Sequence, residues 1–138
     1  SVLDDIYTQE GTKEILEIFG DAKVFSFPKP TKLIKKLIEI SGASSDDIIL
    51  DFFAGSGSTG EAIMQLNTED GCYRKFILCQ IDEPIKESTP AHEFCVINNL
   101  PQLISSITIE RLNRAGEKIV KEIEAENSKI GLFDDDRK

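Results

Sequence analysis

The chain has few of the residues that build metal sites, disulfide frameworks or membrane spans. It holds one histidine, His92, and three cysteines that form no Cys-x-x-Cys pair. A His-Cys metal site and a Ser-His-Asp triad therefore lack partners, and an odd cysteine count fits poorly with a disulfide framework. No apolar run reaches about 18 residues, so we expect a soluble cytoplasmic protein with its cysteines as small buried side chains.

Positive charge is also scarce. Lys and Arg number 16 against 25 Asp and Glu, which gives a formal net charge of −9. Because affinity for duplex DNA rests largely on neutralisation of phosphates by Lys and Arg, the chain alone should bind DNA weakly. Its 138 residues, 40% of them hydrophobic, are enough for one compact α/β domain over residues 1–138, with a frayed tail from about 129 to 138.

The hydrophobic periodicity changes along the chain in the order typical of an α/β protein. Two continuous apolar runs, Ile48–Phe53 and Phe76–Ile81, indicate parallel strands covered on both faces. Thr31 is placed to cap a helix that Gly42 ends. Helices are expected over residues 12–19, 32–41, 61–66 and 104–126, with an extended segment over residues 24–27. The centre of the chain therefore reads as a β-α-β unit with a right-handed crossover.

The chemistry is concentrated where the first strand meets a glycine-rich loop. The strand ends near Asp51, and residues 52–60 read Phe-Phe-Ala-Gly-Ser-Gly-Ser-Thr-Gly before the helix. In a parallel sheet this arrangement lets a ligand lie across the carboxyl ends of the strands, where backbone N–H groups point outward. Gly55 and Gly57 lack a Cβ, so the backbone can approach the ligand there. Valine at Gly57 is thus expected to abolish binding without unfolding the chain.

The same loop also fits other hypotheses. Gly55-x-Gly57-x-x-Gly60 matches the dinucleotide fingerprint, with Asp82 at about the distance of a ribose-binding acid, so an NAD-dependent oxidoreductase stays open. A third possibility is a domain that keeps the fold and binds no cofactor. Against the dinucleotide hypothesis, a long segment with its own motif precedes the first strand.

Two motifs resemble those of the amino-methylating DNA methyltransferases of the β arrangement, most closely the modification subunits of type III restriction systems. Residues 51–59, Asp-Phe-Phe-Ala-Gly-Ser-Gly-Ser-Thr, are similar to the family's methionine-binding loop, with Ser58 in place of the usual threonine. Residues 25–31, Phe-Ser-Phe-Pro-Lys-Pro-Thr, resemble the family's tenth motif, which closes over the cofactor. Residues 67–77 and 109–115 resemble the second motif region and a later helix, so the resemblance covers roughly residues 12 to 120.

The resemblance implies a partial Rossmann-like fold that binds S-adenosylmethionine, in an enzyme that methylates DNA, at adenine N6 in the type III kind. It also implies a restriction subunit as partner. In this family, Gly55, Ser56 and Gly57 would lie against the methionine, and Lys29 would meet its carboxylate. The implied cofactor-binding residues are Phe27, Lys29, Thr31, Asp51, Phe53, Ala54, Gly55, Ser56, Gly57, Ser58, Thr59, Gln80 and Asp82.

Several of these residues have specific expected roles. Asp51 would hold the loop or the cofactor's amino group, and Phe27 and Phe53 would wall the adenine. Many relatives end the second strand with a glutamate that binds both ribose hydroxyls, whereas this chain has Gln80 there. An amide gives up the charge-assisted strength of a carboxylate, so Asp82 or Glu83 is a candidate substitute. Gln80 is also the one feature that favours a domain without cofactor.

Two further expectations follow from what the chain lacks. The family's catalytic motif, Asp/Asn/Ser-Pro-Pro-Tyr/Phe, and a target-recognition region are both missing from these 138 residues. We therefore expect no catalytic residue here, and contact with DNA through other parts of a full-length protein. Because the strands beyond the first one would come from elsewhere, the first strand should form an uncovered sheet edge that favours self-association.

Overall fold

A computed structural model describes residues 2–135 of the chain. Its elements are α1 (Val2–Phe19), a 3-10 helix η1 (Ala22–Val24), α2 (Thr31–Ser41), β1 (Ile48–Asp51), α3 (Ser58–Asp70), β2 (Lys75–Leu78), α4 (Pro90–Ile97) and α5 (Ile104–Asp135). The two strands pair in parallel. An α/β fold with parallel strands flanked by helices is thus confirmed. Within the described range, no helix is both long enough and apolar enough to cross a membrane.

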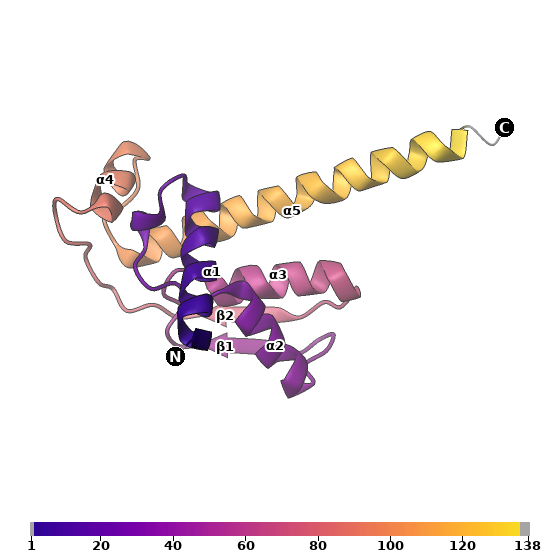
Figure 1. Cartoon of the computed structure of the whole chain (residues 1–138), viewed down its shortest axis with the longest axis horizontal. Helices are drawn as coiled ribbons and strands as arrows, with labels where there is room; N and C mark the ends of the chain where they lie inside the picture. Colours follow the sequence, from indigo (N-terminus) through magenta and orange to yellow (C-terminus); the bar gives the residue numbers. More distant parts are fainter. Residues whose placement is uncertain (1, 136–138) are drawn as a thin grey trace.

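α2 and α3 cover one face of the sheet, and α4 lies apart from the strands beside the start of α5 (Figure 1). α3 joins β1 to β2 and packs between the sheet and α5. At Gly60 an added Cβ would lie 2.5 Å from the Leu112 side chain of α5 and 3.2 Å from the Leu78 side chain of β2, so α3 packs closely against both elements there. The core of this region contains Ile34, Ile38, Ile49, Ile63, Leu66 and Phe76.

A second core joins α1 and η1 to α4 and the start of α5. It contains Ile15, Phe19, Val24, Ile85, Cys95 and Ile107, from α1, η1, α4, α5 and the segment before α4. The guanidinium of Arg114 lies over the rings of Phe19 and Phe94, 5.5 and 5.2 Å from their centroids. The sequence had not predicted α4, although Thr89 followed by Pro90 is a common helix start. The Thr89 hydroxyl accepts the His92 N–H, which caps α4.

The turn between α3 and β2 is fixed by Arg74. Its guanidinium donates to the Asp70 carboxylate at 2.7 Å and to the Ala43 carbonyl at 2.8 Å. The hydrogen bond from Arg74 lowers the pKa of Asp70 to about 2. The Asn67 side chain bonds to both the N–H and the carbonyl of Arg74. Residues 67–77 thus span the end of α3, the turn at 71–74 and the start of β2, and Arg74 and Asn67 hold that turn.

Several helix bounds differ from the expected ones. α1 begins at Val2, before the expected residue 12, and its Gly11 lies so close to the Pro28 carbonyl that a Cβ there would collide with it. The extended segment expected over residues 24–27 does not form, because Val24 ends the 3-10 helix η1, residues 25–27 are bends and Phe27 has a positive φ. α3 starts at Ser58, three residues before the expected Glu61. α5 continues to Asp135 because its Glu, Lys and Ala residues favour helix, and the rest of the expected tail, 136–138, lies outside the described residues.

The expectation that both faces of the strands are covered was wrong for the described residues. Ile49 and Phe76 pack beneath the helices, but side chains on the opposite face are open: Ile48 is 59% exposed, Leu50 48% and Ile77 52%. An apolar run does not say which elements cover it. The cysteines also differ from expectation. Only Cys95 is buried, while Cys72 is partly exposed and Cys79 is exposed.

Candidate functional site

The glycine loop leaves the carboxyl end of β1 and enters α3. One oxygen of Asp51 accepts the Phe53 N–H at 2.9 Å, and the other accepts the Thr59 hydroxyl at 2.7 Å. The Ala54 N–H donates to the Cys79 carbonyl at 2.9 Å, which extends the strand pairing into the loop. The Asp51 carboxylate thus ties the start of the loop to the first turn of α3.

Gly55 is held from both sides. Its N–H donates to the Gln80 side-chain carbonyl at 2.8 Å, and its carbonyl accepts the Thr108 hydroxyl of α5. The loop needs left-handed backbone here, with φ of 52° at Gly55 and 84° at Gly57. Gln80, which the resemblance assigns to the ribose, therefore also braces the loop, and its NH₂ group remains as a donor.

Gly57 faces α5, not an open space. A Cβ added there would lie 3.2 Å from the Thr108 carbonyl oxygen and 3.7 Å from the Leu112 side chain. A valine would therefore press on the helix instead of occupying ligand space. This geometry favours a loss of stability in the variant, in contrast to the expectation that the fold stays intact.

The serine hydroxyls of the loop point inward to a buried arginine. Arg111 of α5 is 0% exposed, and its Nη1 donates to the hydroxyl oxygens of Ser56 at 2.7 Å and Ser58 at 2.9 Å. Its Nε donates to Glu61 at 2.7 Å, and its Nη2 to Glu14 at 3.0 Å. Ser56 and Ser58 are among the residues implied for the cofactor, but in this structure the partners of their hydroxyls are protein atoms.

Glu14 carries the connection on to α2. Its carboxylate accepts the Thr31 hydroxyl at 2.8 Å and the Thr31 N–H at 3.1 Å. Pro30 is the N-cap residue and Thr31 the first residue of the helix, so the expected capping by Thr31 is performed by Glu14 from α1. Burial raises the pKa of Glu14, against the lowering effect of its bonds to Thr31 and the charge of Arg111. Sequence analysis missed Glu14, Glu61 and Arg111.

The segment that resembles the tenth motif lies beside the loop. The Ser58 hydroxyl donates to the Lys29 carbonyl, while the Lys29 side chain is exposed between buried Pro28 and Pro30. Phe27 is 84% exposed and Phe53 is 81% exposed, so neither is a core residue. Asp82, beyond the end of β2, is exposed as well.

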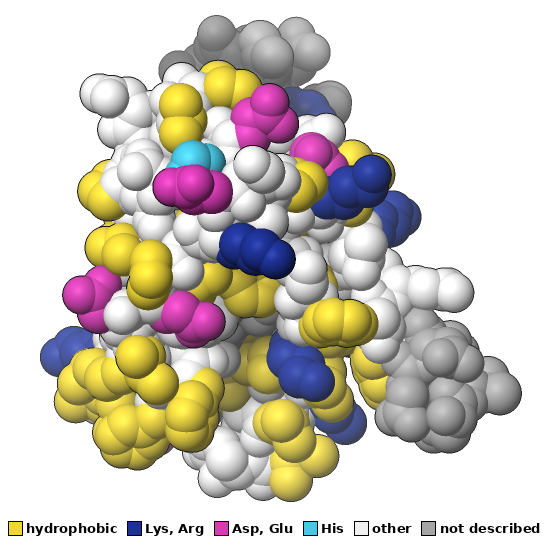
Figure 2. All heavy atoms as spheres, turned by 90° about the vertical axis from the view of Figure 1, so that its left-hand side faces the viewer, with side chains coloured by type: hydrophobic (Ala, Val, Ile, Leu, Met, Phe, Trp, Pro, Cys, Tyr) yellow, Lys and Arg dark blue, Asp and Glu magenta, His cyan; other side chains and the backbone are white. Residues whose placement is uncertain are grey.

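A cleft of about 700 Å³ opens next to this segment. Its lining includes Phe25, Phe27, Glu83, Pro84 and Lys86. The Phe25 ring lies 3.6 Å from the position of a Cβ on Gly55, so the cleft and the loop are neighbours. Figure 2 views this side of the molecule, toward which the strands point, and shows hydrophobic side chains gathered along its lower part.

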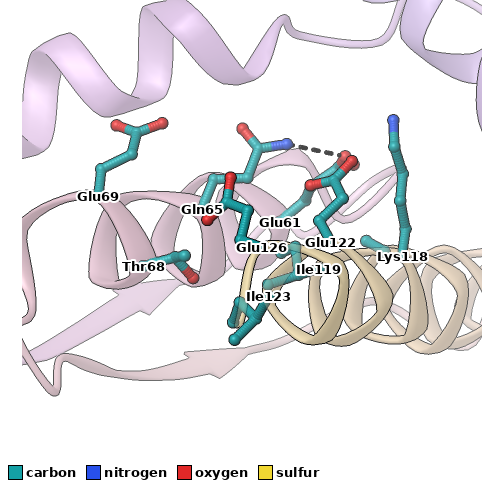
Figure 3. Close-up of a pocket in the computed structure, with 10 residues that line it drawn as sticks. Glu61, Gln65, Thr68, Glu69, Lys118, Ile119, Glu122, Ile123 and Glu126 are labelled. Atoms are coloured by element: carbon teal, nitrogen blue, oxygen red, sulfur yellow. Dashed lines mark hydrogen bonds between the residues drawn. The ribbon is translucent and has the colours of Figure 1, made fainter. Parts of the chain in front are cut away.

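A second hollow, of about 270 Å³, lies between α3 and α5. Figure 3 shows Glu61 and Gln65 of α3 facing Glu122 and Glu126 of α5, with the Gln65 amide donating to Glu61. None of the residues implied for the cofactor is among those that line it. Its acidic walls would also repel the carboxylate of an amino-acid-like ligand.

Comparison with known proteins identifies the family. A family profile described as DNA methylase matches residues 2–90. The chain belongs to the DNA methylase family. It is 46% identical over 124 residues to the type III restriction-modification enzyme StyLTI Mod subunit of Salmonella typhimurium, covering 90% of this chain and 18% of that protein. It is 44% identical over 107 residues to the type II methyltransferase M.KpnI of Klebsiella pneumoniae, covering 78% of this chain and 24% of that protein.

The EcoPI Mod subunit of Escherichia phage P1 is a further relative, 45% identical over 85 residues, which are 62% of this chain and 13% of that protein. This DNA methylase chain thus spans less than a quarter of the length of each of these relatives. The resemblance to type III modification subunits is confirmed, and so is membership of an enzyme family. The comparisons do not support the NAD-dependent alternative.

Proposed function

We propose that this chain is the S-adenosylmethionine-binding portion of a site-specific DNA methyltransferase that modifies adenine at N6, of the type III restriction-modification kind. The observation that carries the proposal is the braced glycine loop at the carboxyl end of β1, beside a cleft and an exposed Phe-Pro-Lys-Pro segment. Its β-α-β unit then forms part of a Rossmann-like methyltransferase fold. The similarity to Mod subunits supports the substrate and the system.

The residues present fit this cofactor. The N–H groups of Gly55 and Gly57 are taken by the Gln80 side chain and the Ala54 carbonyl, so the Ser56 N–H and the first turn of α3 are what the loop offers to the methionine part. The Lys29 ammonium is free to meet the carboxylate, and Asp82 is available for the ribose. When bound, the cofactor supplies the electrophilic methyl group. The protein's part is to hold it and to exclude water around it.

The conformation of Phe27 supports a role in binding. Its φ is 53°, in the left-handed region that a bulky side chain adopts only at a cost of about 1–2 kcal/mol. Its ring is 84% exposed, so burial in this chain does not offset that cost. Strain of this kind is typical of binding sites. We infer that the ring stacks on the adenine at the cleft, which Phe27 lines and Phe53 does not.

Cofactor binding is the first prediction. Isothermal titration should detect S-adenosylhomocysteine binding, and Phe27→Ala should weaken it about tenfold or more because stacking on a base contributes about 1–3 kcal/mol. The matched control is Tyr73→Ala, which removes an aromatic side chain that is 77% exposed near the amino end of β2 and should leave affinity unchanged. A flat titration with folded protein would contradict the proposal, and a signal for NAD instead would revive the dinucleotide hypothesis.

The proposal also includes partners and location. A restriction subunit is expected to assemble with the full-length protein, as the Mod designation of the relatives suggests, and DNA is expected to contact regions outside these residues. Such a system acts on DNA in the cytoplasm. The net charge of −9 agrees with a portion that binds cofactor and leaves most DNA contacts to other segments.

Self-association of this chain is the second prediction. The open sheet face with Ile48, Leu50 and Ile77, next to the free edge of β1, should pair with a second copy in concentrated solution. Light scattering should then give a mass above the 15.4 kDa of one chain. Leu50→Glu should restore the monomer, whereas Ile130→Glu, at an exposed position far along α5, should not. A wild-type monomer at high concentration would contradict the prediction.

A further inference from the structure

One buried side chain connects the glycine loop, the start of α3 and α1. The Arg111 guanidinium can donate five hydrogen bonds in a rigid planar fork. Four of them are accounted for, and they reach the loop at Ser56, the start of α3 at Ser58 and Glu61, and α1 at Glu14. Because Arg111 comes from α5, about fifty residues beyond the loop, its contacts fix the loop against a separate element.

Two of these partners continue the connection to the segment around Lys29. Ser58 accepts from Arg111 and donates to the Lys29 carbonyl. Glu14 accepts from Arg111 and also accepts the Thr31 hydroxyl and N–H. Arg111 is therefore linked by hydrogen bonds to Lys29 through Ser58 and to Thr31 through Glu14. Both ends of the Lys29-Pro30-Thr31 turn depend on it.

We propose that Arg111 is a positioning residue that holds the glycine loop and the Lys29 turn in their relative places before the methionine part of the cofactor binds. The inference rests on the proposed function. It goes beyond that function because Arg111 is 0% exposed and lines none of the cleft, so it acts through the groups it holds. Lysine cannot substitute, since a single ammonium on a flexible stem cannot reach four acceptors in fixed directions.

The test uses a conservative variant and a matched control on the same helix. Arg111→Lys keeps the charge beside Glu61 but loses the fork. Arg114→Lys makes the same change one turn later, where the guanidinium contacts Glu110 and the Ile18 carbonyl, away from the loop. Two measurements are made: hydrogen exchange of the amides of residues 54–58 without ligand, and affinities for S-adenosylhomocysteine and for methylthioadenosine, which lacks the amino-acid part.

In Arg111→Lys we expect loop exchange and the dissociation constant of S-adenosylhomocysteine each to rise about tenfold or more, the loss expected for charge-assisted hydrogen bonds. Methylthioadenosine affinity should change by less than about twofold, and Arg114→Lys should leave all three values within that range. Unchanged loop exchange, or an equal loss of both ligands, would overturn the proposal, since the second result marks a general loss of structure.

A second variant keeps the proposal testable if Arg111→Lys does not fold. Glu14→Ala removes the path from Arg111 to Thr31 and should weaken S-adenosylhomocysteine binding while sparing methylthioadenosine. Wild-type affinity for both ligands in this variant would overturn the proposal. If the wild-type chain binds neither ligand, the proposed function fails. Loop exchange in the variants then still shows whether Arg111 holds the loop.

Discussion

Replacing Gly57 with valine is expected to destabilise the fold by about 3 kcal/mol or more, not merely to prevent cofactor binding. Two costs combine at this position. The φ of 84° is strained for any side chain, and most for a β-branched one. In addition, the new Cβ would lie 3.2 Å from the backbone carbonyl of Thr108, which cannot move without shifting α5. Urea unfolding followed by circular dichroism measures the loss.

Gly71 provides the control for backbone strain. Its φ is 70°, close to that of Gly57, but no heavy atom lies within 4 Å of an added Cβ. Gly71→Val should therefore show the strain alone, about 1–2 kcal/mol. The difference between the two variants isolates the clash with α5. Equal losses would mean that the loop moves away from α5 at little cost and that the packing described here does not hold the loop in place.

The loop itself was predictable from sequence, but the direction in which it faces was not. A strand, a run of small residues and a helix place Gly55 and Gly57 at the carboxyl end of β1 whatever surrounds them. Which side of the loop meets ligand depends on Thr108 and Leu112, which lie about fifty residues away. Local spacing carries no information about such a contact.

The same limit applies to the serines and to Arg111. Ser56 and Ser58 are reasonable hydroxyl donors by residue type, yet a buried guanidinium needs acceptors and takes both of them. A signal for Arg111 was present, since residues 109–115 place an arginine among the apolar positions of a helix. An arginine on the inner face of a helix needs carboxylates, and two of them, Glu14 and Glu61, come from α1 and α3. Only the fold brings them together.

The exposed sheet face shows a different limit. The apolar runs around β1 and β2 correctly predicted parallel strands, because such runs are typical of sheets buried between helices. In the described part of the chain the helices cover only the face of Ile49 and Phe76. The sheet face with Ile48, Leu50 and Ile77 is therefore apolar enough to be buried, but no helix in the described residues packs on it. This agrees with a chain that spans 18% of the StyLTI Mod subunit.

These 138 residues are expected to transfer no methyl group to DNA, even when they bind the cofactor well. Amino methylation requires a pocket that takes the flipped base, stacks an aromatic ring on it and accepts hydrogen bonds from its amino nitrogen. In the family this belongs to the Asp/Asn/Ser-Pro-Pro-Tyr/Phe motif, which the chain lacks. Its nearest sequences, Phe27-Pro-Lys-Pro30 and Asp82-Glu-Pro84, have no adjacent prolines followed by an aromatic residue.

Charge adds a second obstacle to the same reaction. Extruding a base costs a few kcal/mol, which a methyltransferase recovers from contacts with the duplex. A net charge of −9 leaves little attraction to phosphates. The chain is therefore expected to lack both the affinity for duplex DNA and the pocket for the flipped base. The test is transfer of radiolabelled methyl from S-adenosylmethionine to genomic DNA, with M.KpnI as the positive control. Saturable transfer by this chain would show that a catalytic residue lies within it, and the assignment of a cofactor-binding portion would then be wrong.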